Sequence, residues 1–283
     1  MKVLVTGIKG QLGHDVVKCL QARGIECLGA GREEFDITDM AQTERFIKAY
    51  QPDAVIHCSA YTNVNKAEEE QELCYQVNAK GPENIARVCR ALDAKLLHVS
   101  TDYVFPGTGE QFYETDDPTG PVSVYGKSKC EGEEAVRAAW DKHFIVRVSW
   151  IYGKNGNNFV KTMLKLGAER PEVRVVCDQI GSPTYTVDLA ELLCDMIETE
   201  QYGTYHASNE GVCSWAEFTE EIFKLAGYSA KVTPIPTSEY PTPAARPLNS
   251  RMSKACLDRA GLKRLPDWKD ALKRYLKELE VIK

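Results

Sequence analysis

The chain has 283 residues, with 35 Lys and Arg against 41 Asp and Glu, so its net charge is −6. This excess of acid argues against nucleic acid or an anionic membrane as the main partner, because binding to phosphates needs a basic surplus. Hydrophobic residues make up 43% of the chain and no apolar run reaches membrane-spanning length, which is typical of a globular protein. The N-terminus lacks the pattern of a signal peptide, so a cytoplasmic location is expected.

Ten cysteines are scattered along the chain, and no two form a Cys-x-x-Cys pair. The five histidines do not cluster beside them. Zinc sites need such clusters, and disulfide frameworks are typical of small secreted domains. We therefore expect reduced thiols that pack as small hydrophobes, with neither a disulfide framework nor a metal site.

Short apolar runs alternate with helical patterns through the first half of the chain. The apolar runs predict strands at residues 3–6, 26–30, 54–57, 95–100 and 144–148. Helical spacing of apolar residues predicts helices at 12–20, from 38 or 39 to about 50, at 70–92 and at 125–139. Strands separated by helices in this order predict an α/β fold with a doubly wound, Rossmann-like parallel sheet.

The second half of the chain has a different pattern. A strand is predicted at 173–176 and helices at 187–197, 215–226 and 267–279, whereas 233–236 and 240–243 are expected to be extended, proline-punctuated loops. We expect an NAD(P)-binding Rossmann domain over residues 1–150, joined by later strand and helix returns near 171–206. Residues 151–283 would form mainly a smaller, interleaved substrate-binding lobe.

Three glycines, Gly7, Gly10 and Gly13, lie between the first predicted strand and the first predicted helix. Gly7 permits a tight turn, Gly10 lets the backbone approach a pyrophosphate, and Gly13 lets the helix pack closely on the strand. The helix N-terminus offers free N–H groups and a positive dipole end to the phosphates. A glycine-rich turn without a ligand is the alternative, but the position at the start of a βαβ series favours a dinucleotide cofactor.

The residues after the second predicted strand bear on which nicotinamide cofactor is used. An acid at this place usually holds the ribose hydroxyls of NAD(H). Here the strand is followed by Arg32, a cation suited to a 2′-phosphate. Because Glu33, Glu34 and Asp36 follow closely, we expect NADPH as the cofactor and leave NADH open.

Tyr125 and Lys129 stand four residues apart on a predicted helix, so their side chains point the same way. The lysine ammonium is expected to lower the pKa of Tyr125, making it a proton donor to a developing alkoxide. Thr101 ends the fourth predicted strand, where doubly wound folds bind ligands, and its hydroxyl could polarise a substrate carbonyl. Standing alone, the Tyr-x-x-x-Lys pair would favour an ordinary surface helix. Together with the glycine loop and the strand-end hydroxyl of Thr101, it favours a catalytic site, and we predict these three residues to be catalytic.

The glycine loop, the strand-end threonine and the Tyr-x-x-x-Lys pair together resemble the extended short-chain dehydrogenase/reductases. Within them, the chain is similar to the dTDP-4-dehydrorhamnose reductases over nearly its whole length. Eight segments in order carry this similarity, namely residues 7–13, 35–38, 60–62, 100–105, 124–129, 147–153, 178–184 and 246–250.

The resemblance implies which further residues contact the cofactor. These are Gly10, Gln11 and Leu12 at the phosphates, Asp36 and Ile37 beside the adenine, and Ala60, Tyr61 and Thr62 along the nicotinamide half. Tyr125 and Lys129 would also reach the nicotinamide ribose.

The resemblance likewise implies which residues contact the substrate. They are Thr101 and Asp102 at the sugar, Trp150 packed on it, and Arg246 at the nucleotide diphosphate. Trp150 could instead belong to the core and Asp102 could be a turn cap. Asn78, on the long helix, is left outside the predicted site. Asn65 replaces an aspartate that relatives often have.

Some relatives are dimers linked by magnesium through acidic residues. Asp15 and Glu191 are the counterparts in this chain. Two carboxylates are too few for a convincing magnesium site, so no metal is predicted. The assembly is expected to be a monomer or a homodimer.

The implied activity is reduction of the C4 keto group of dTDP-4-dehydro-β-L-rhamnose by NADPH, giving dTDP-L-rhamnose. The alternatives are an epimerase or reductase acting on another nucleotide-4-keto-sugar, or a non-catalytic regulatory subunit of the kind that methionine adenosyltransferase has. A dehydratase is disfavoured, because Asp102 is followed by Tyr103 and has no adjacent glutamate. The expected partner is a small nucleotide sugar.

Overall fold

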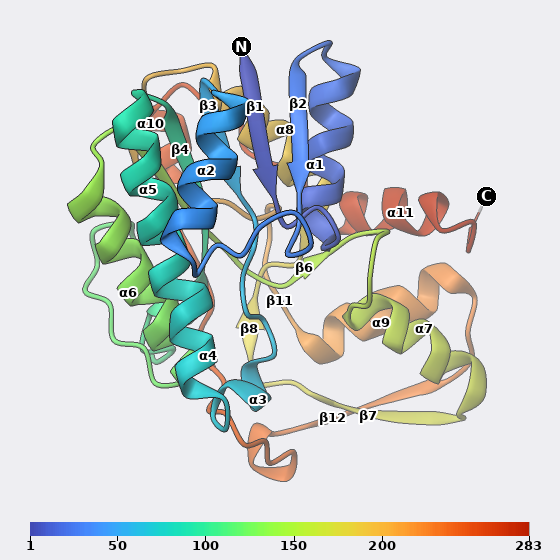
Figure 1. Cartoon of the computed structure of the whole chain (residues 1–283). Coiled ribbons are helices and arrows are strands. Elements are labelled where there is room, and N and C mark those ends of the chain that lie inside the picture. The colour runs from blue at the N-terminus through green and yellow to red at the C-terminus, as the bar shows by residue number, and fades with distance from the viewer. Residues whose placement is uncertain (283) are drawn as a thin grey trace.

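The computed structural model describes residues 1–282, and its centre is a six-stranded parallel sheet (Figure 1). The order across the sheet is β10-β5-β4-β3-β1-β2, and every neighbouring pair is parallel. The strands are β1 (Lys2–Thr6), β2 (Glu26–Ala30), β3 (Ala54–His57), β4 (Lys95–Thr101), β5 (His143–Val148) and β10 (Gly203–His206). The predicted doubly wound α/β fold is confirmed.

Alternate residues of each strand face opposite layers of helices, as the two-residue period of a strand requires. Val3 and Val5 pack in one core cluster, and Leu4 between them packs in another; none of the three has exposed surface. The first layer contains α1 (Gln11–Ala22) and α8 (Thr186–Ile197), and the second contains α2 (Met40–Tyr50), α5 (Gly81–Leu92) and α6 (Val124–Ala139). Because both faces are covered, the strands read as continuous apolar runs.

The crossing direction of the chain reverses between β1 and β3. From β1 the chain crosses to β2 at one edge, whereas β3 leads through β4 and β5 to β10 at the other. Doubly wound sheets bind ligands outside the carboxyl ends of the strands at such a reversal. The glycine loop after β1 and the residues after β3 and β4 therefore border the expected crevice.

The helix predicted at 70–92 has three consecutive parts. A π-helical segment, η1 (Gln76–Lys80), joins α4 (Gln71–Tyr75) to α5. Asn78 lies in η1, and its carbonyl oxygen is only 2.1 Å from where a Cβ on Gly132 of α6 would stand. The wider π-helical turn and the glycine together let the two helices approach closely at this point. The short helix α3 (Val64–Ala67) precedes this stretch.

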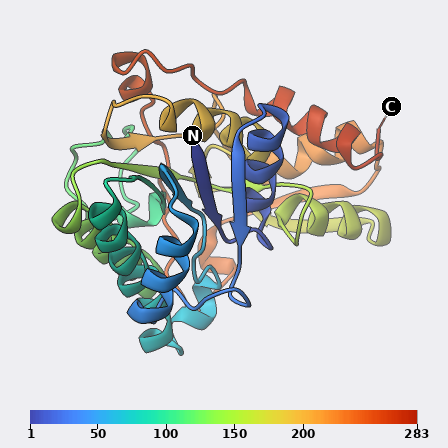
Figure 2. The same ribbon diagram turned by 45° about the horizontal axis from the view of Figure 1, so that its top comes forward.

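A second lobe lies beside the sheet and is built on its own core of aromatic and aliphatic side chains (Figures 1 and 2). Its two-stranded parallel sheet pairs β7 (Glu172–Val176) with β12 (Lys231–Ile235). The helices are α7 (Phe159–Glu169), α9 (Trp215–Ala226) and α11 (Trp268–Glu278). In Figure 1 the arrows of β1 and β2 point down towards the layer that holds β7 and β12.

Several short elements connect the lobe to the sheet. They are β6 (Ile151–Tyr152), β8 (Ile180–Gly181), β9 (Thr184–Tyr185), β11 (Cys213–Ser214), α10 (Ala255–Arg259) and the 3₁₀ turns η2 (Asp102–Val104) and η3 (Thr237–Glu239). Two small ladders, β6 with β9 and β8 with β11, hold these crossing segments together.

Within the expected range of returns near 171–206, α8 and β10 join the Rossmann half, whereas β7 pairs with β12 of the second lobe. The predicted loop at 233–236 begins as strand β12, which accommodates Pro234 because the strand has only one neighbour. Helix α7 was not predicted. Asp39, rather than Thr38, caps α2 by accepting hydrogen bonds from the backbone of Ala41 and Gln42.

Candidate active site

Thr101 is the last residue of β4 and lies almost fully buried at the carboxyl end of the sheet. Its hydroxyl donates to Asp102 Oδ1 at 3.0 Å and accepts a hydrogen bond from the backbone of Tyr103 at 3.3 Å. The chain turns sharply here because η2 begins at the next residue. The strand end thus presents a hydroxyl and a carboxylate side by side.

Tyr125 is half-buried near the start of α6, beside the end of β4. Its ring meets that of Tyr103 edge to face, with centroids 5.4 Å apart. Burial raises the pKa of Tyr125 above its usual value, and the Thr101 hydroxyl opposes that rise. The expected lowering of this pKa by Lys129 is therefore wrong for this structure, and Tyr125 is held in its protonated form.

Lys129 points to the backbone of β4. It is 1% exposed, its Nζ donates to Val99 O at 2.7 Å, and it lies 3.5 Å from His98 Nε2. Burial lowers the pKa of Lys129 to about 8, although Glu133 opposes the shift. A carbonyl partner does not neutralise the ammonium, so loss of hydration decides the direction.

Asp102 is 3% exposed and is held by two hydroxyl donors. Thr101 donates to its Oδ1, and Ser250 donates to its Oδ2 at 2.5 Å. Burial raises the pKa of Asp102 to about 6, and these hydrogen bonds limit the rise. Asp102 therefore does more than cap a turn, since its carboxylate joins the strand end to the segment that contains Ser250.

Asn78, which the sequence-based prediction left out, contacts the loop that contains the predicted site residue Tyr61. Its Oδ1 accepts from the backbone of Tyr61 at 2.8 Å, and its Nδ2 donates to Tyr61 O and to Ser128 Oγ, both at 3.1 Å. The Asn78 amide therefore holds the loop after β3 against α6, where its partner Ser128 directly precedes Lys129. No motif marks this role in the sequence, because the partners lie far from Asn78 along the chain.

The glycine loop fits a pyrophosphate. Gly7 has a left-handed φ of +75°, and a Cβ on Gly13 would lie 2.5 Å from Gly7 O. The only neighbour that a Cβ on Gly10 would meet is Gly7 O, at 3.1 Å, so the space on its other sides is open. No side chain caps the N-terminus of α1 and no acid stands in its first turn. Its free N–H groups are therefore available to an anion.

Gln11 and Leu12 begin α1, but their side chains contact other parts of the protein and not the expected phosphate site. Gln11 Oε1 accepts from the backbone of Gly153 and from Asn158 Nδ2, both at 2.9 Å, which ties the helix to the second lobe. Leu12 is buried in the core between α1 and the sheet. Their predicted contacts with cofactor phosphates would thus come from backbone N–H groups, and they stay predictions.

The region after β2 leaves one cation uncommitted. Lys9 pairs with Glu33, and Glu34 accepts a hydrogen bond from the backbone of Gly31 at 2.6 Å. Arg32 is exposed and has no ion pair within residues 1–282. Asp36 accepts from the backbone and hydroxyl of Thr38. The three acids near Arg32 thus have partners close to them in the sequence or in the glycine loop. This favours Arg32 as the ligand of a 2′-phosphate.

The remaining predicted cofactor residues follow β2 and β3. Ile37 is buried against Gly81 at the start of α5. Ala60 and Tyr61 are half-buried and Thr62 is exposed, all in the loop after β3. The Tyr61 hydroxyl donates to Glu70 Oε2 at 2.7 Å, and this acid raises the pKa of Tyr61 to about 12. The Tyr61 hydroxyl is thereby turned to α4, so its predicted contact with the nicotinamide half stays untested.

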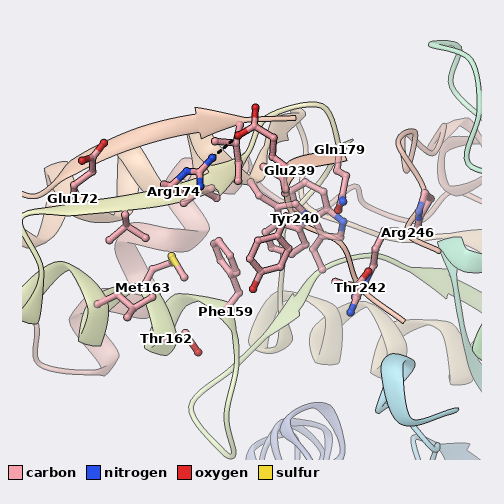
Figure 3. A pocket seen from close by; sticks show the side chains of 18 of the residues that line it. Phe159, Thr162, Met163, Glu172, Arg174, Gln179, Glu239, Tyr240, Thr242 and Arg246 are labelled. Atoms are coloured by element: carbon pink, nitrogen blue, oxygen red, sulfur yellow. Dashed lines mark hydrogen bonds and ion pairs between the residues drawn. The ribbon is translucent and has the colours of Figure 1, made fainter. Parts of the chain in front are cut away.

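A cavity of about 820 Å³ opens in the second lobe, and Tyr103, which follows β4, borders it. Figure 3 shows Phe159 and Met163 of α7 on one side and Arg174, Glu239 and Tyr240 on the other, with Arg174 and Glu239 paired. Tyr103 and Arg246 line the end of the cavity that adjoins Tyr125. The predicted catalytic residues therefore lie next to a large cavity lined by aromatic and charged side chains.

Trp150 lines this cavity in an unusual backbone conformation. Its φ is +50°, and its indole stacks on that of Trp215 with ring centroids 3.7 Å apart. Positive φ is uncommon and costly for an aromatic residue, and residues held in such strained conformations cluster at functional sites. Trp150 also packs against the hydrophobic core of the second lobe. One part of its side chain therefore belongs to the core, and another part lines the cavity.

Arg246 is held by two neutral groups. Its Nη1 donates to the Tyr103 hydroxyl and its Nη2 donates to Asn65 Oδ1, both at 3.1 Å. Because Asn65 is an amide, it orients the guanidinium without cancelling its charge. The cation is therefore available to an anionic ligand in the cavity.

The proposed magnesium counterparts do not meet. Asp15 accepts from Thr186 Oγ1 at 2.5 Å, whereas Glu191 pairs with Arg23 at 2.5 Å.

Within residues 1–282 no three His, Cys, Asp or Glu side chains are arranged to hold a metal ion, and the ten cysteines form no disulfide. In the same range, no helix has the length and apolar character needed to cross a membrane.

The doubly wound sheet, the glycine loop after β1 and the Tyr-x-x-x-Lys helix beside β4 define the class of short-chain dehydrogenase/reductases. Residues 1–281 match the family model described as the RmlD substrate binding domain. The chain is 42% identical over 277 residues to the spore coat polysaccharide biosynthesis protein SpsK of Bacillus subtilis, covering 98% of this chain and 97% of that protein.

Two further relatives carry a more specific name. A dTDP-4-dehydrorhamnose reductase of Streptomyces griseus is 42% identical over 276 residues, covering 95% of this chain and 91% of that protein. The crystal structure of dTDP-4-dehydrorhamnose reductase from Bacillus anthracis in complex with NADP superimposes with a TM-score of 0.96 and 42% identity, covering 98% and 99% of the two chains. The chain belongs to the dTDP-4-dehydrorhamnose reductase family.

Proposed function

We propose that the protein reduces the C4 keto group of dTDP-4-dehydro-β-L-rhamnose with NADPH and forms dTDP-L-rhamnose. The observation that carries this is the meeting of Thr101 and Tyr125 at the strand end, beside a cavity of about 820 Å³. Cavities of this size hold small-molecule ligands. Membership of the family supports the substrate, and the NADP complex of the Bacillus anthracis relative supports the cofactor.

The proton chemistry follows from the buried hydroxyls. Bound NADPH would supply the hydride to C4. As negative charge develops on the C4 oxygen, Tyr125, held protonated by its raised pKa, donates its phenolic proton. The single hydroxyl proton of Thr101 goes to Asp102 in this structure, so it must turn to the sugar oxygen to stabilise it. Lys129 would exchange its Val99 carbonyl for ribose hydroxyls.

The cavity supports a place for the nucleotide. Trp150, Trp215 and Phe159 offer apolar ring faces to a base or sugar. Arg246 offers an uncancelled charge to the diphosphate, at the end of the cavity nearest the catalytic set. Packing of the base or sugar on these ring faces, and pairing of the diphosphate with Arg246, would hold the sugar in position for hydride transfer.

The test is an absorbance assay for NADPH with the purified protein and dTDP-4-dehydrorhamnose made in place by a 3,5-epimerase. We expect one NADPH oxidised per epimerised sugar, and slower oxidation of NADH because Arg32 favours a 2′-phosphate. An epimerase that returns its hydride, or a regulatory subunit, would consume no net NADPH. That outcome would overturn the proposal.

Location and assembly are separate from this chemistry. A cytoplasmic location, and a monomeric or homodimeric state, stay predictions from the sequence. Sedimentation of the purified protein at micromolar concentration would distinguish the two states.

A further inference from the structure

Ser250 is buried at the sugar end of the site, although it lies far along the chain from the catalytic residues. It is 1% exposed, and its hydroxyl donates to Asp102 Oδ2 at 2.5 Å. Asp102 is itself 3% exposed, and no cation is paired with it within residues 1–282. A buried carboxylate without a cation depends on hydrogen-bond donors to stay ionised and in place.

The backbone around Ser250 is firmly anchored. Ser250 N donates to Ile180 O at 2.8 Å, and Leu248 N and Asn249 N both donate to Gly107 O at 3.0 Å. Asn249, which is 1% exposed, adds a hydrogen bond from its side chain to Gln111 O at 2.8 Å. Ser250 is thus presented by a rigid segment, which makes its hydroxyl a fixed reference point for the Asp102 carboxylate.

Gly181 makes this arrangement sterically feasible. A Cβ on Gly181 would lie 2.8 Å from the Trp150 ring and 3.0 Å from Ser250 Cβ. Asp102, Ser250, Gly181 and Trp150 therefore form one continuous wall, which joins the strand end to the aromatic cavity. The same C-terminal segment contains Arg246, which donates to Tyr103.

We propose that Ser250 is a positioning residue for the reduction, fixing the Asp102 carboxylate and through it the hydroxyl of Thr101. This inference rests on the proposed reductase function. The Thr101 hydroxyl has one proton, which goes to Asp102 here and must turn to the sugar during reduction. When it turns, Ser250 remains as the donor that holds Asp102, so the carboxylate can still accept from a sugar hydroxyl.

The test compares S250A with S208A, a control variant at another serine that is 1% exposed and lies outside the site. For S250A we expect kcat/KM for the keto sugar to fall on the order of 10- to 100-fold, the loss typical of a hydrogen bond to a charged group. The Kd for NADPH should stay within about twofold. S250T, which keeps the hydroxyl, should recover most of the activity.

The pH profile supplies the readout that a merely structural serine would not move. The groups that face Asp102 are Thr101, Ser250, Tyr103 and Tyr125, and Arg246 reaches only Tyr103. The pKa of Asp102 is raised to about 6, so kcat/KM of the unmodified protein should fall below about pH 6. Loss of the Ser250 donor disfavours the charged form, and S250A should therefore move this limb to higher pH.

Three results would overturn the proposal. The first is that S250A is as active as S208A. The second is that the acid limb of the S250A pH profile does not move, while turnover of the sugar and affinity for NADPH fall equally. The third is that S250T folds but is as slow as S250A. Failure of the reductase function itself is distinct, because the unmodified protein would then leave NADPH unoxidised with the epimerised sugar.

Discussion

The sheet half and the second lobe differ in how far apart along the chain their contacting residues lie. In the sheet half, Thr101, Tyr125 and Lys129 come from one strand and the helix after it. In the lobe, β7 meets β12 and Trp150 stacks on Trp215 across long stretches of other structure. Local motifs therefore bring the predicted catalytic residues together, whereas long-range packing shapes the cavity of the second lobe. Four substitutions test that division.

The largest effect is expected for Tyr125→Phe, which breaks the chemical half of the comparison. Loss of the phenolic proton should lower kcat by about 10²- to 10⁴-fold, because Tyr125 supplies the proton in the proposed reduction. The Kd for NADPH, measured by nicotinamide fluorescence, should change little. Tyr103→Phe is the matched control, since the Tyr103 hydroxyl accepts a hydrogen bond from Arg246. It should raise KM more than it lowers kcat, and equal kcat losses in both variants would contradict the assignment.

Gly13→Ala tests whether the glycine loop is built for the cofactor. A Cβ there would lie 2.5 Å from Gly7 O, so the loop must shift and the free energy of unfolding should fall by roughly 1 to 3 kcal/mol. NADPH binding should weaken more than sugar binding, as isothermal titration would show. Gly120→Ala, where the nearest atoms would lie at 3.5 Å, is the control. Unchanged NADPH affinity in Gly13→Ala would sink this role.

Lys129→Met tests whether the buried ammonium of Lys129 destabilises the fold. Burial lowers the pKa of Lys129 to about 8, from 10.5 in an unfolded chain, so the charged form destabilises the fold at neutral pH. After allowing for the lost bond to Val99 O, the variant should gain about 2 kcal/mol in free energy of unfolding at pH 7.

The sign of this pH dependence is fixed by the direction of the shift. The stability of the unmodified protein should rise between about pH 8 and pH 10.5, because the folded state loses the Lys129 proton first. The advantage of Lys129→Met should therefore be full below pH 8, shrink as the pH rises, and reverse above pH 10.5, where only the lost bond to Val99 O remains; parallel urea titrations measure it. An advantage that does not depend on pH would contradict the buried-charge explanation.

Trp215→Ala should have the smallest effect and tests the lobe. It removes the ring that stacks on Trp150 at 3.7 Å, so KM for the nucleotide sugar should rise on the order of 10-fold while kcat changes less. Trp140→Ala, at the far end of α6 and outside the cavity, is the control for loss of an indole. A fall in kcat without a rise in KM would move Trp215 out of the binding role.

The same division explains what the sequence could predict. The strands of the sheet were predictable because both of their faces are covered, which makes them continuous apolar runs such as Val3–Val5. Tyr125, Lys129 and the glycines were predictable because their spacing within one element carries the geometry. Ser250 and Asn78 were not, because each acts through partners that only the folded chain brings near. Strand β12 was missed because Pro234 suggests a loop unless its single neighbour is known.

The direction of the Tyr125 pKa shift could not be predicted from spacing either. A lysine four residues away on a helix suggested a lowered value, but Lys129 donates to the Val99 carbonyl and burial raises the pKa instead. Burial is a property of the assembled fold, so it overrides an argument from one helix.

The most direct test of the account follows the hydride itself. The protein would be given NADPH deuterated at C4 of the nicotinamide, on the transferred face, together with the epimerised keto sugar, and the product examined by NMR and mass spectrometry. The account predicts one deuterium at C4 of the rhamnosyl group for each NADPH consumed. Product without deuterium at C4, or deuterium returned to the cofactor with no net oxidation, would contradict direct reduction of the keto sugar.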